Sequence, residues 1–135
     1  MRLHHVQVSC PVSGEDGARR FYGDVLGLPE VDKPPVLAAR GGCWFRRGDV
    51  EVHVGVEEDF SPARKAHPAF LVDSVEELRA TAVLVEQGGF PLRWDDDFPG
   101  YRRFHTADGS GNRVELLAEL RQLESSPGNA EATVG

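Results

Sequence analysis

Cysteine is scarce in this chain: only Cys10 and Cys43 occur, and their spacing excludes a Cys-x-x-Cys pair. The start of the sequence, from Met1 to His5, leads into an alternating strand pattern and lacks the apolar core of a signal peptide. Few cysteines and no secretion signal are typical of a protein from a reducing compartment. We therefore expect a cytoplasmic protein.

Long apolar runs and an excess of basic residues are also missing. No segment approaches the roughly 20 apolar residues that a membrane-spanning helix needs, so the sequence predicts no membrane partner. The 15 basic residues are outnumbered by 22 acidic ones, which gives a formal net charge of -7. Because such a chain repels phosphate backbones, nucleic acid is not expected as a partner. The length of 135 residues suits one ordinary domain and is too short for two independent ones.

What the sequence does contain is an internal repeat. Adding 62 to a residue number in the first half leads, without any gap, to a matching position in the second half. The matched pairs include His5 and His67, Gly27 and Gly89, Pro29 and Pro91, Val52 and Val114, and His53 and Glu115. Each half also has the same order of elements: a strand, a helix, a Gly-x-Pro break and further short strands. The sequence therefore predicts an α+β fold, in which two tandem βαβββ modules form a cup-shaped mixed sheet with the helices on the outside.

The first module is expected to span residues 3–56. Residues 3–9 alternate between apolar and polar, as a half-buried strand does. Apolar side chains then recur with helical spacing from Ala18 to Leu26, with Ser13 as the expected helix cap and Gly27 as the stop. Three short strands are predicted after this helix, at residues 37–39, 43–46 and 50–56.

The second module is expected to span residues 66–119, after a polar, proline-containing linker at residues 57–65. A strand at residues 67–72 precedes a helix that begins at Ser74, where Glu77 completes a capping box. Further strands are predicted at residues 91–94, 102–106 and 112–118. The two modules together make one domain over residues 1–120, and residues 121–135 are expected to form a flexible tail.

Side chains two residues apart on a strand share a face, and this rule sorts the polar residues of the predicted strands. At residues 50–56 the valines share one face, which leaves Glu51 and His53 on the other. In the same way His5, His67 and Glu115 lie opposite the apolar faces of their own strands. The repeat pairs His5 with His67 and His53 with Glu115, so equivalent positions of the two modules carry candidate ligands.

Imidazole nitrogens and carboxylate oxygens together suit a divalent ion such as iron, manganese, nickel, cobalt or zinc. We therefore expect His5, His67 and Glu115 to hold a divalent metal of undetermined identity. For His53 taken singly, a solvated or hydrogen-bonded side chain is the simpler interpretation, because a lone strand histidine is seldom a ligand.

Four segments of the chain resemble a known family. They are His-Val-Gln-Val at residues 5–8, Arg-Phe-Tyr-Gly-Asp-Val-Leu-Gly-Leu at 20–28, Ala-His-Pro-Ala-Phe at 66–70 and Gly-Asn-Arg-Val-Glu-Leu at 111–116. The pattern is similar to that of the vicinal oxygen chelate superfamily, which includes glyoxalases, fosfomycin thiol transferases, extradiol dioxygenases and bleomycin-binding proteins. The likeness covers about residues 3–119.

The resemblance carries a metal-ligand pattern onto this chain, because the family places its ligands on the first and last strand of each module. It implies His5, His67 and Glu115 as ligands, and it puts the fourth place at His53 or Glu51, which would complete the metal shell or move a proton. Glyoxalases are the most similar members in ligand layout, although they usually carry glutamate where this chain has His53.

Other members of the family match less well. Fosfomycin enzymes carry serine and tyrosine where this chain has Arg103 and His105, and extradiol dioxygenases are typically about twice as long. Bleomycin-binding proteins generally lack the metal ligands. The usual Asp-Pro before the last strand is Asp108-Gly109 here.

These observations lead to two hypotheses about function. The first is an enzyme, a lyase, an isomerase or a related type, whose metal binds two neighbouring oxygens of a small substrate and stabilises an enolate or oxyanion. Arg103 and His105 would then orient an anionic group of the substrate and Trp44 would line an apolar wall; alternatively, Arg103 pairs with an aspartate of residues 95–97 and Trp44 belongs to the core. The second hypothesis is a non-catalytic protein that binds a small molecule or antibiotic. A homodimer is expected, and the cup is compatible with assembly within one chain or between two.

Overall fold

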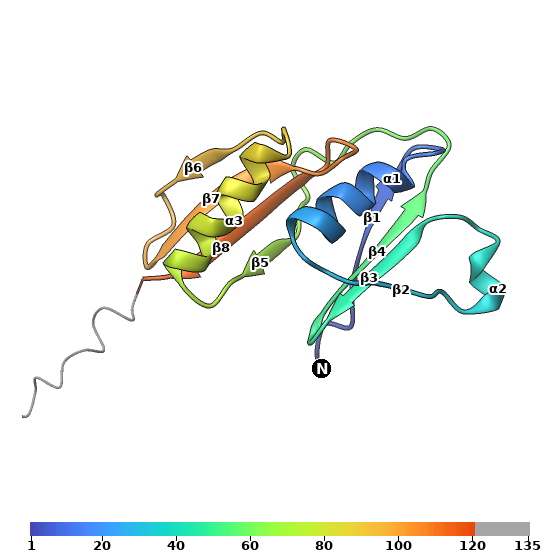
Figure 1. The fold of residues 1–135 in the computed structure, drawn as a ribbon, viewed down its shortest axis with the longest axis horizontal. Helices are drawn as coiled ribbons and strands as arrows, with labels where there is room; N and C mark the ends of the chain where they lie inside the picture. The colour runs from blue at the N-terminus through green and yellow to red at the C-terminus, as the bar shows by residue number, and fades with distance from the viewer. Residues whose placement is uncertain (121–135) are drawn as a thin grey trace, which may run out of the picture.

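Two four-stranded sheets lie side by side in the computed structural model, which describes residues 1–120 (Figure 1). The predicted tail at residues 121–135 lies outside the described residues. Within residues 1–120, no helix combines the length and the apolar composition that a membrane crossing requires.

The first sheet has the strand order β1-β4-β3-β2. Strand β1 runs parallel to β4, and the other neighbours are antiparallel. The elements of this module are β1 (Val6–Cys10), α1 (Glu15–Ala18), the π-helix η1 (Arg19–Val25), β2 (Glu30–Val31), α2 (Pro35–Ala38), β3 (Cys43–Arg47) and β4 (Val50–Val56).

The second sheet repeats this arrangement with the order β5-β8-β7-β6. Strand β5 is parallel to β8, and β8, β7 and β6 are antiparallel neighbours. Its elements are β5 (Ala69–Leu71), α3 (Val75–Gln87), β6 (Arg93–Asp95), β7 (Tyr101–Ala107) and β8 (Arg113–Glu119). The predicted α+β fold of two tandem βαβββ modules is confirmed.

The strand register follows the sequence repeat. In the first sheet Gln7 lies opposite His53, and in the second sheet Ala69 lies opposite Glu115. Each residue of the second pair is 62 positions after its counterpart in the first, so the two parallel strand pairs have equivalent registers. The repeat therefore predicts which side chains become neighbours on each sheet.

The segment at residues 37–39, predicted as a strand, instead forms the end of the short helix α2 and its C-cap, Ala39. Pro35 stands in the first turn of this helix, where the missing backbone N–H of proline costs no hydrogen bond. The amide of Leu37 donates to the carbonyl of Pro34, which closes the turn. The strand prediction was wrong because Pro34 and Pro35 start a helical turn in this apolar segment; the two-residue strand β2 was not predicted.

The first helix differs from the prediction at its start and in its winding. Ser13 has a positive φ of 69° and does not cap the helix; Gly14 occupies the cap position, where no side chain makes a capping bond. After one α-helical turn the chain widens into the π-helix η1, in which the amide of Leu26 donates to the carbonyl of Phe21. At α3 the prediction is confirmed, because the Ser74 hydroxyl accepts from the amide of Glu77.

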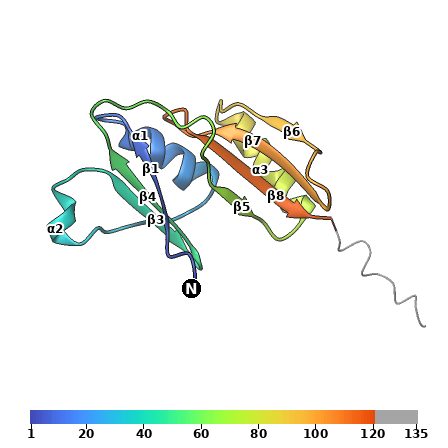
Figure 2. The same cartoon turned by 180° about the vertical axis from the view of Figure 1, so that it is seen from behind.

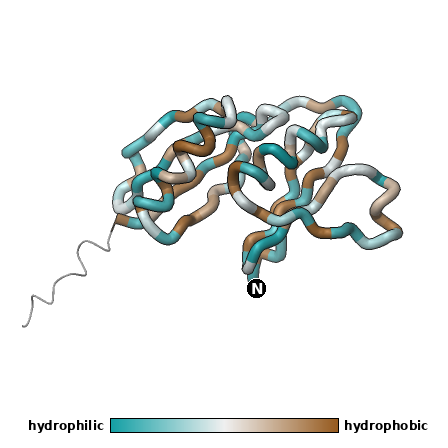
Figure 3. Tube along the Cα trace, in the orientation of Figure 1, coloured by the Kyte–Doolittle hydropathy of each residue, from teal (hydrophilic) through white to brown (hydrophobic). Residues whose placement is uncertain are grey.

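The helices of both modules cover the same side of the two sheets. Figure 1 shows α1 and α3 in front of the strands, and Figure 2 shows the opposite, helix-free side. The helices also pack on each other, because α3 contacts η1 and the ring of Phe21 meets that of Phe90 edge-on at 5.1 Å. Along the strands and α3, hydrophobic and hydrophilic residues alternate (Figure 3), which leaves an open face on each sheet for polar side chains.

A buried network joins the two modules. The Tyr22 hydroxyl of η1 donates to Oδ2 of Asp108 at 2.7 Å, and Asn112 Nδ2 donates to the carbonyl of Ser9 at 2.8 Å. Asn112 Oδ1 in turn accepts from the amide of Ala63 in the linker. These bonds fix the second module against the first strand and against the linker, so the open faces of the two sheets have one defined relative placement.

Candidate metal site

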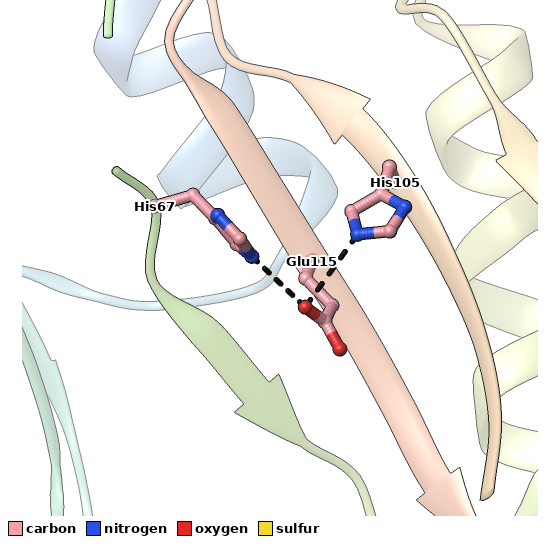
Figure 4. A group of neighbouring side chains, drawn as sticks. All are labelled: His67, His105 and Glu115. Atoms are coloured by element: carbon pink, nitrogen blue, oxygen red, sulfur yellow. Dashed lines mark hydrogen bonds and ion pairs between the residues drawn. The ribbon is translucent and has the colours of Figure 1, made fainter. Parts of the chain in front are cut away.

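The open face of the second sheet brings together two histidines and a glutamate. Strand register places His105 of β7 directly opposite Glu115 of β8. On the other side of β8, Glu115 pairs with Ala69, and His67 precedes Ala69 by two residues. Figure 4 shows the three side chains converging, with Glu115 between the two rings.

Distances within this group are short enough for a shared ligand. Nε2 of His67 lies 2.9 Å from Oε1 of Glu115, and Nε2 of His105 lies 3.5 Å from the same oxygen. Within residues 1–120, the set His67, His105 and Glu115 is the group of three histidine, cysteine or acidic residues whose ligand atoms all lie within 4.8 Å of one another.

The backbone fixes the protonation of one ring nitrogen of His67. Nδ1 of His67 lies 2.7 Å from the carbonyl oxygen of Lys65, and because a carbonyl only accepts, Nδ1 carries a proton. In the neutral ring, Nε2 then directs a lone pair at the carboxylate of Glu115. Such a contact is repulsive unless Nε2 is also protonated or a cation lies between the two atoms. A carbonyl bond that fixes the free nitrogen is also the usual support for a metal-binding histidine.

His105 is a buried ring with Glu115 3.5 Å from Nε2 and Asp95 3.9 Å from Nδ1. Only 5% of the residue is exposed, and neither ring nitrogen has a hydrogen-bond partner among the described residues. Burial, followed by the nearby charge of Arg113, lowers the pKa of His105, which favours the neutral ring with a free lone pair. Because a buried polar atom without a partner costs free energy, these nitrogens require a ligand. The donor set therefore fits a divalent metal ion.

Glu115 is held in its charged form by its neighbours. Burial acts to raise the pKa of Glu115, but the contact with His67 and the hydrogen bond from Arg103 outweigh it, so the pKa is lowered. Arg103 Nη1 donates to Glu115 at 3.2 Å, and Nη2 donates to Asp95 at 3.2 Å. The sequence left the partner of Arg103 open; the structure pairs it with both Asp95 and Glu115, whereas Asp96 pairs with Arg102.

A second group of candidate residues lies on the open face of the first sheet. His53 Nε2 and Glu51 Oε2 are 2.8 Å apart, and this bond is the main cause that lowers the pKa of Glu51. The ring of Trp44 stacks on His53 with centroids 3.7 Å apart, and the ring of His5 stacks at 3.9 Å. Since β4 lies between β1 and β3, the two rings approach His53 from opposite sides.

The two groups occupy equivalent places in the two modules. Trp44 lies directly opposite His53 on the neighbouring strand, as His105 lies directly opposite Glu115. His105 was predicted to bind substrate, and its position beside the candidate ligands was missed. Parity alone does not give this neighbour, because it depends on the register between β7 and β8.

Within a single chain, the predicted site residues thus form two groups rather than one. His67 and Glu115 lie together with His105 and Arg103 on the second sheet. His5 is outside the group of three; it lies beside His4 and His53, together with the other predicted residues of the first sheet. Trp44 lines the open face, where His53 stacks on it, rather than the core between sheet and helices.

Comparison with known proteins agrees with this architecture. No curated protein matches the sequence. Among solved structures, a glyoxalase family protein from Bacillus anthracis is 43% identical, with a TM-score of 0.80 over 88% of this chain and 95% of that chain. Lactoylglutathione lyase from Agrobacterium tumefaciens is 19% identical, with a TM-score of 0.64 over 84% of this chain and 91% of that one. The fosfomycin resistance protein FosX from Listeria monocytogenes is 16% identical, with a TM-score of 0.71 over 93% of this chain and 97% of that one.

For the lyase and FosX, which are less than 25% identical, the likeness shows the fold alone. The sequence itself matches a family over residues 2–116. That stretch contains the first module, the second module as far as Leu116, and every candidate site residue named above. By its sequence and its fold, the chain belongs to the Glyoxalase/Bleomycin resistance protein/Dioxygenase superfamily.

Proposed function

We propose that this chain is a metal-dependent enzyme of the glyoxalase type, a lyase, an isomerase or an enzyme of related chemistry, which acts on a small substrate with two neighbouring oxygen atoms. The observation that carries the proposal is the arrangement of His67: its Nδ1 is fixed by the Lys65 carbonyl and its Nε2 faces Glu115 at 2.9 Å. This arrangement is stable with a cation between the ring and the carboxylate or with Nε2 protonated, and the contact is repulsive when neither is present.

The residues that would hold the ion are His67 and Glu115, with His105 as a third donor beside them and His5 as the ligand expected from the other module. When bound, a divalent ion at this place acts as a Lewis acid toward substrate oxygens and stabilises negative charge that develops on them. Arg103 keeps the Glu115 carboxylate charged and in place, since it bonds Glu115 and Asp95 together.

His53 and Glu51 are suited to move a proton. The bond between His53 Nε2 and Glu51 holds the imidazole in one orientation, and Trp44 and His5 restrain both faces of the ring. A neighbouring carboxylate stabilises the imidazolium that forms when the ring takes a proton. His53 thus has the orientation and the charge support of a general base, with Glu51 as its positioning residue.

We further propose that two chains associate so that the first sheet of one faces the second sheet of the other. In one chain the His53 group and the His67 group are carried by different sheets, and His5 is absent from the group of three. A twofold axis would place the His53 group of each chain against the His67 group of the other chain, so the pairing would occur twice in the dimer. Light scattering after gel filtration should therefore give about twice the mass of the chain.

The experiment that tests the proposed function measures metal content and turnover on the same sample. Purified protein is analysed for bound zinc, nickel, manganese, iron and cobalt, and each metal-loaded form is then assayed with adducts of dicarbonyls and thiols. We expect about one ion per chain, and turnover that stops on chelation and returns when the ion is restored. His67→Ala should lose the ion, whereas His4→Ala, a change in an exposed histidine next to the site, should retain it.

Two results would contradict the proposal. Unaltered metal uptake in His67→Ala would remove the ligand assignment. A protein that binds the adducts, or an antibiotic, without converting them and without any bound ion would instead support the non-catalytic binding function.

A further inference from the structure

Three arginines that form no ion pair within residues 1–120 line one hollow beside the candidate metal site. Arg64, Arg93 and Arg113 line this hollow of about 410 Å³ together with His105. None of the three forms an ion pair with a carboxylate of the described residues. The concentration of positive charge runs against the net charge of -7 of the whole chain.

The strand register shows how two of these arginines relate to the metal site. Arg93 of β6 lies directly opposite His105, and His105 lies directly opposite Glu115, so the three share one row across the sheet. Arg113 precedes Glu115 by two residues on β8 and therefore points to the same open face. Arg93 and Arg113 thus lie on the same face as the candidate ligands. Arg93 is in the same row as Glu115, and Arg113 is in the neighbouring row along β8.

Arg113 also lines a second hollow, of about 430 Å³, which contains His67. Arg113 thus borders the hollow on the His105 side and the hollow on the His67 side of the group. A molecule bound at His67 and Glu115 would extend past Arg113 toward Arg93.

His105, a candidate metal ligand, also lines this hollow, which places the hollow directly beside the candidate metal site. His105 is 5% exposed, lines the hollow with Arg93 and Arg113, and has no hydrogen bond from either nitrogen among the described residues. Guanidinium groups bind carboxylate and phosphate oxygens with charge-assisted, often bidentate, hydrogen bonds. An anionic group seated between these side chains would pair with charges that have no carboxylate partner among residues 1–120.

We infer that this hollow, lined by Arg93, Arg113 and Arg64, binds an anionic group of the substrate, either a carboxylate or a phosphate-type group. The inference rests on the proposed function for the other half of the substrate, the pair of oxygens directed to His67 and Glu115. It specifies the substrate class as a small oxygen chelator that carries a negatively charged arm.

The test compares two hydroxamates, which chelate divalent ions through two neighbouring oxygens. Acetohydroxamate has no charged arm, and the monohydroxamate of succinic acid has a carboxylate arm. Their dissociation constants are measured by calorimetry on the zinc-loaded full chain, for the wild type, for Arg93→Gln/Arg113→Gln and for Arg79→Gln. Arg79 is the control because it is exposed on α3, which covers the opposite face of the sheet.

In the wild type the carboxylate-armed compound should bind roughly tenfold more tightly than acetohydroxamate. Its carboxylate adds one charge-assisted contact at a partly exposed site. The double variant should lose this preference, and Arg79→Gln should keep it. Equal binding of both compounds to the wild type, or an unchanged preference in the double variant, would overturn the inference.

A parallel measurement on zinc-free protein separates this inference from the proposed function. Inorganic phosphate is titrated into the wild type and both variants, because phosphate requires the arginines but not the ion. Phosphate binding that is lost only in Arg93→Gln/Arg113→Gln supports the anion site even if neither hydroxamate shows zinc-dependent binding. Phosphate binding that is the same in all three proteins, or absent from all three, contradicts it.

Discussion

Removing a single hydroxyl group at the junction of the modules should measurably destabilise the fold. Tyr22 is fully buried, and its hydroxyl donates to Oδ2 of Asp108 at 2.7 Å. Burial, the charge of Asp108 and the hydrogen bond to it all raise the pKa of Tyr22, so the phenol remains a donor throughout the physiological range. Tyr22→Phe removes this donor and keeps the ring in place.

The size of the effect follows from what remains around Asp108. Asn112 Nδ2 still donates to Oδ2 at 3.0 Å, and the amides of Ser110 and Asn112 still donate to Oδ1. The carboxylate therefore keeps other partners, and the loss is that of one hydrogen bond to a charged group, about 2 kcal/mol. For a domain of this length, that corresponds to a fall in the melting temperature of roughly 6–10 °C.

The assay is urea unfolding followed by circular dichroism, with thermal melts of the same samples. The matched control is Tyr101→Phe, because Tyr101 is the other tyrosine of the chain and its hydroxyl makes no hydrogen bond to a described residue. We expect Tyr101→Phe to change the free energy of unfolding by less than about 0.5 kcal/mol. Equal stability of Tyr22→Phe and the wild type would refute the view that this bond fixes the two modules together.

Three further predictions concern local features. The pKa of Glu115 is lowered in the folded state, so its charge stabilises the metal-free protein at pH values above the unfolded-state pKa of about 4.3. This contribution is lost as the pH falls through the folded-state pKa. Glu115→Gln should therefore flatten the loss of stability between about pH 5 and 3 in urea titrations. Gly109→Ala should cost about 1–3 kcal/mol, because a Cβ would lie 2.3 Å from the Gly17 carbonyl oxygen, whereas Gly23→Ala, whose Cβ would meet nothing nearer than 3.6 Å, should not destabilise. Ser74→Ala should cost about 1 kcal/mol through loss of the cap of α3, measured in the same unfolding assay.

The repeat made the fold predictable because it constrains two halves of the chain at once. An offset of 62 aligned β1 with β5 and β4 with β8, and the structure has the same register in both parallel pairs. What failed was local: the helix α2 formed where an apolar segment followed Pro34 and Pro35, and Ser13 did not cap its helix. Short segments have weak signals of their own, so a proline or a change of winding decides their conformation.

The candidate site was predictable only in part. Strand parity placed His67 and Glu115 on one open face, since parity depends on the period of a strand alone. It could not reveal that His105 lies directly opposite Glu115, because that contact depends on the register between β7 and β8, which is set by the turn. Nor could it show that Lys65 would fix the tautomer of His67, a contact made by an irregular segment.

The presence of a metal ion between His67 and Glu115 is the claim on which the proposed function depends. Crystals of the protein grown or soaked with cobalt, and measured at wavelengths on both sides of the cobalt absorption edge, locate that ion directly. We predict one anomalous peak per chain, roughly 2.0–2.3 Å from Nε2 of His67 and from a carboxylate oxygen of Glu115. Cobalt-containing crystals with no peak at these atoms, or with a peak only elsewhere, would contradict the account.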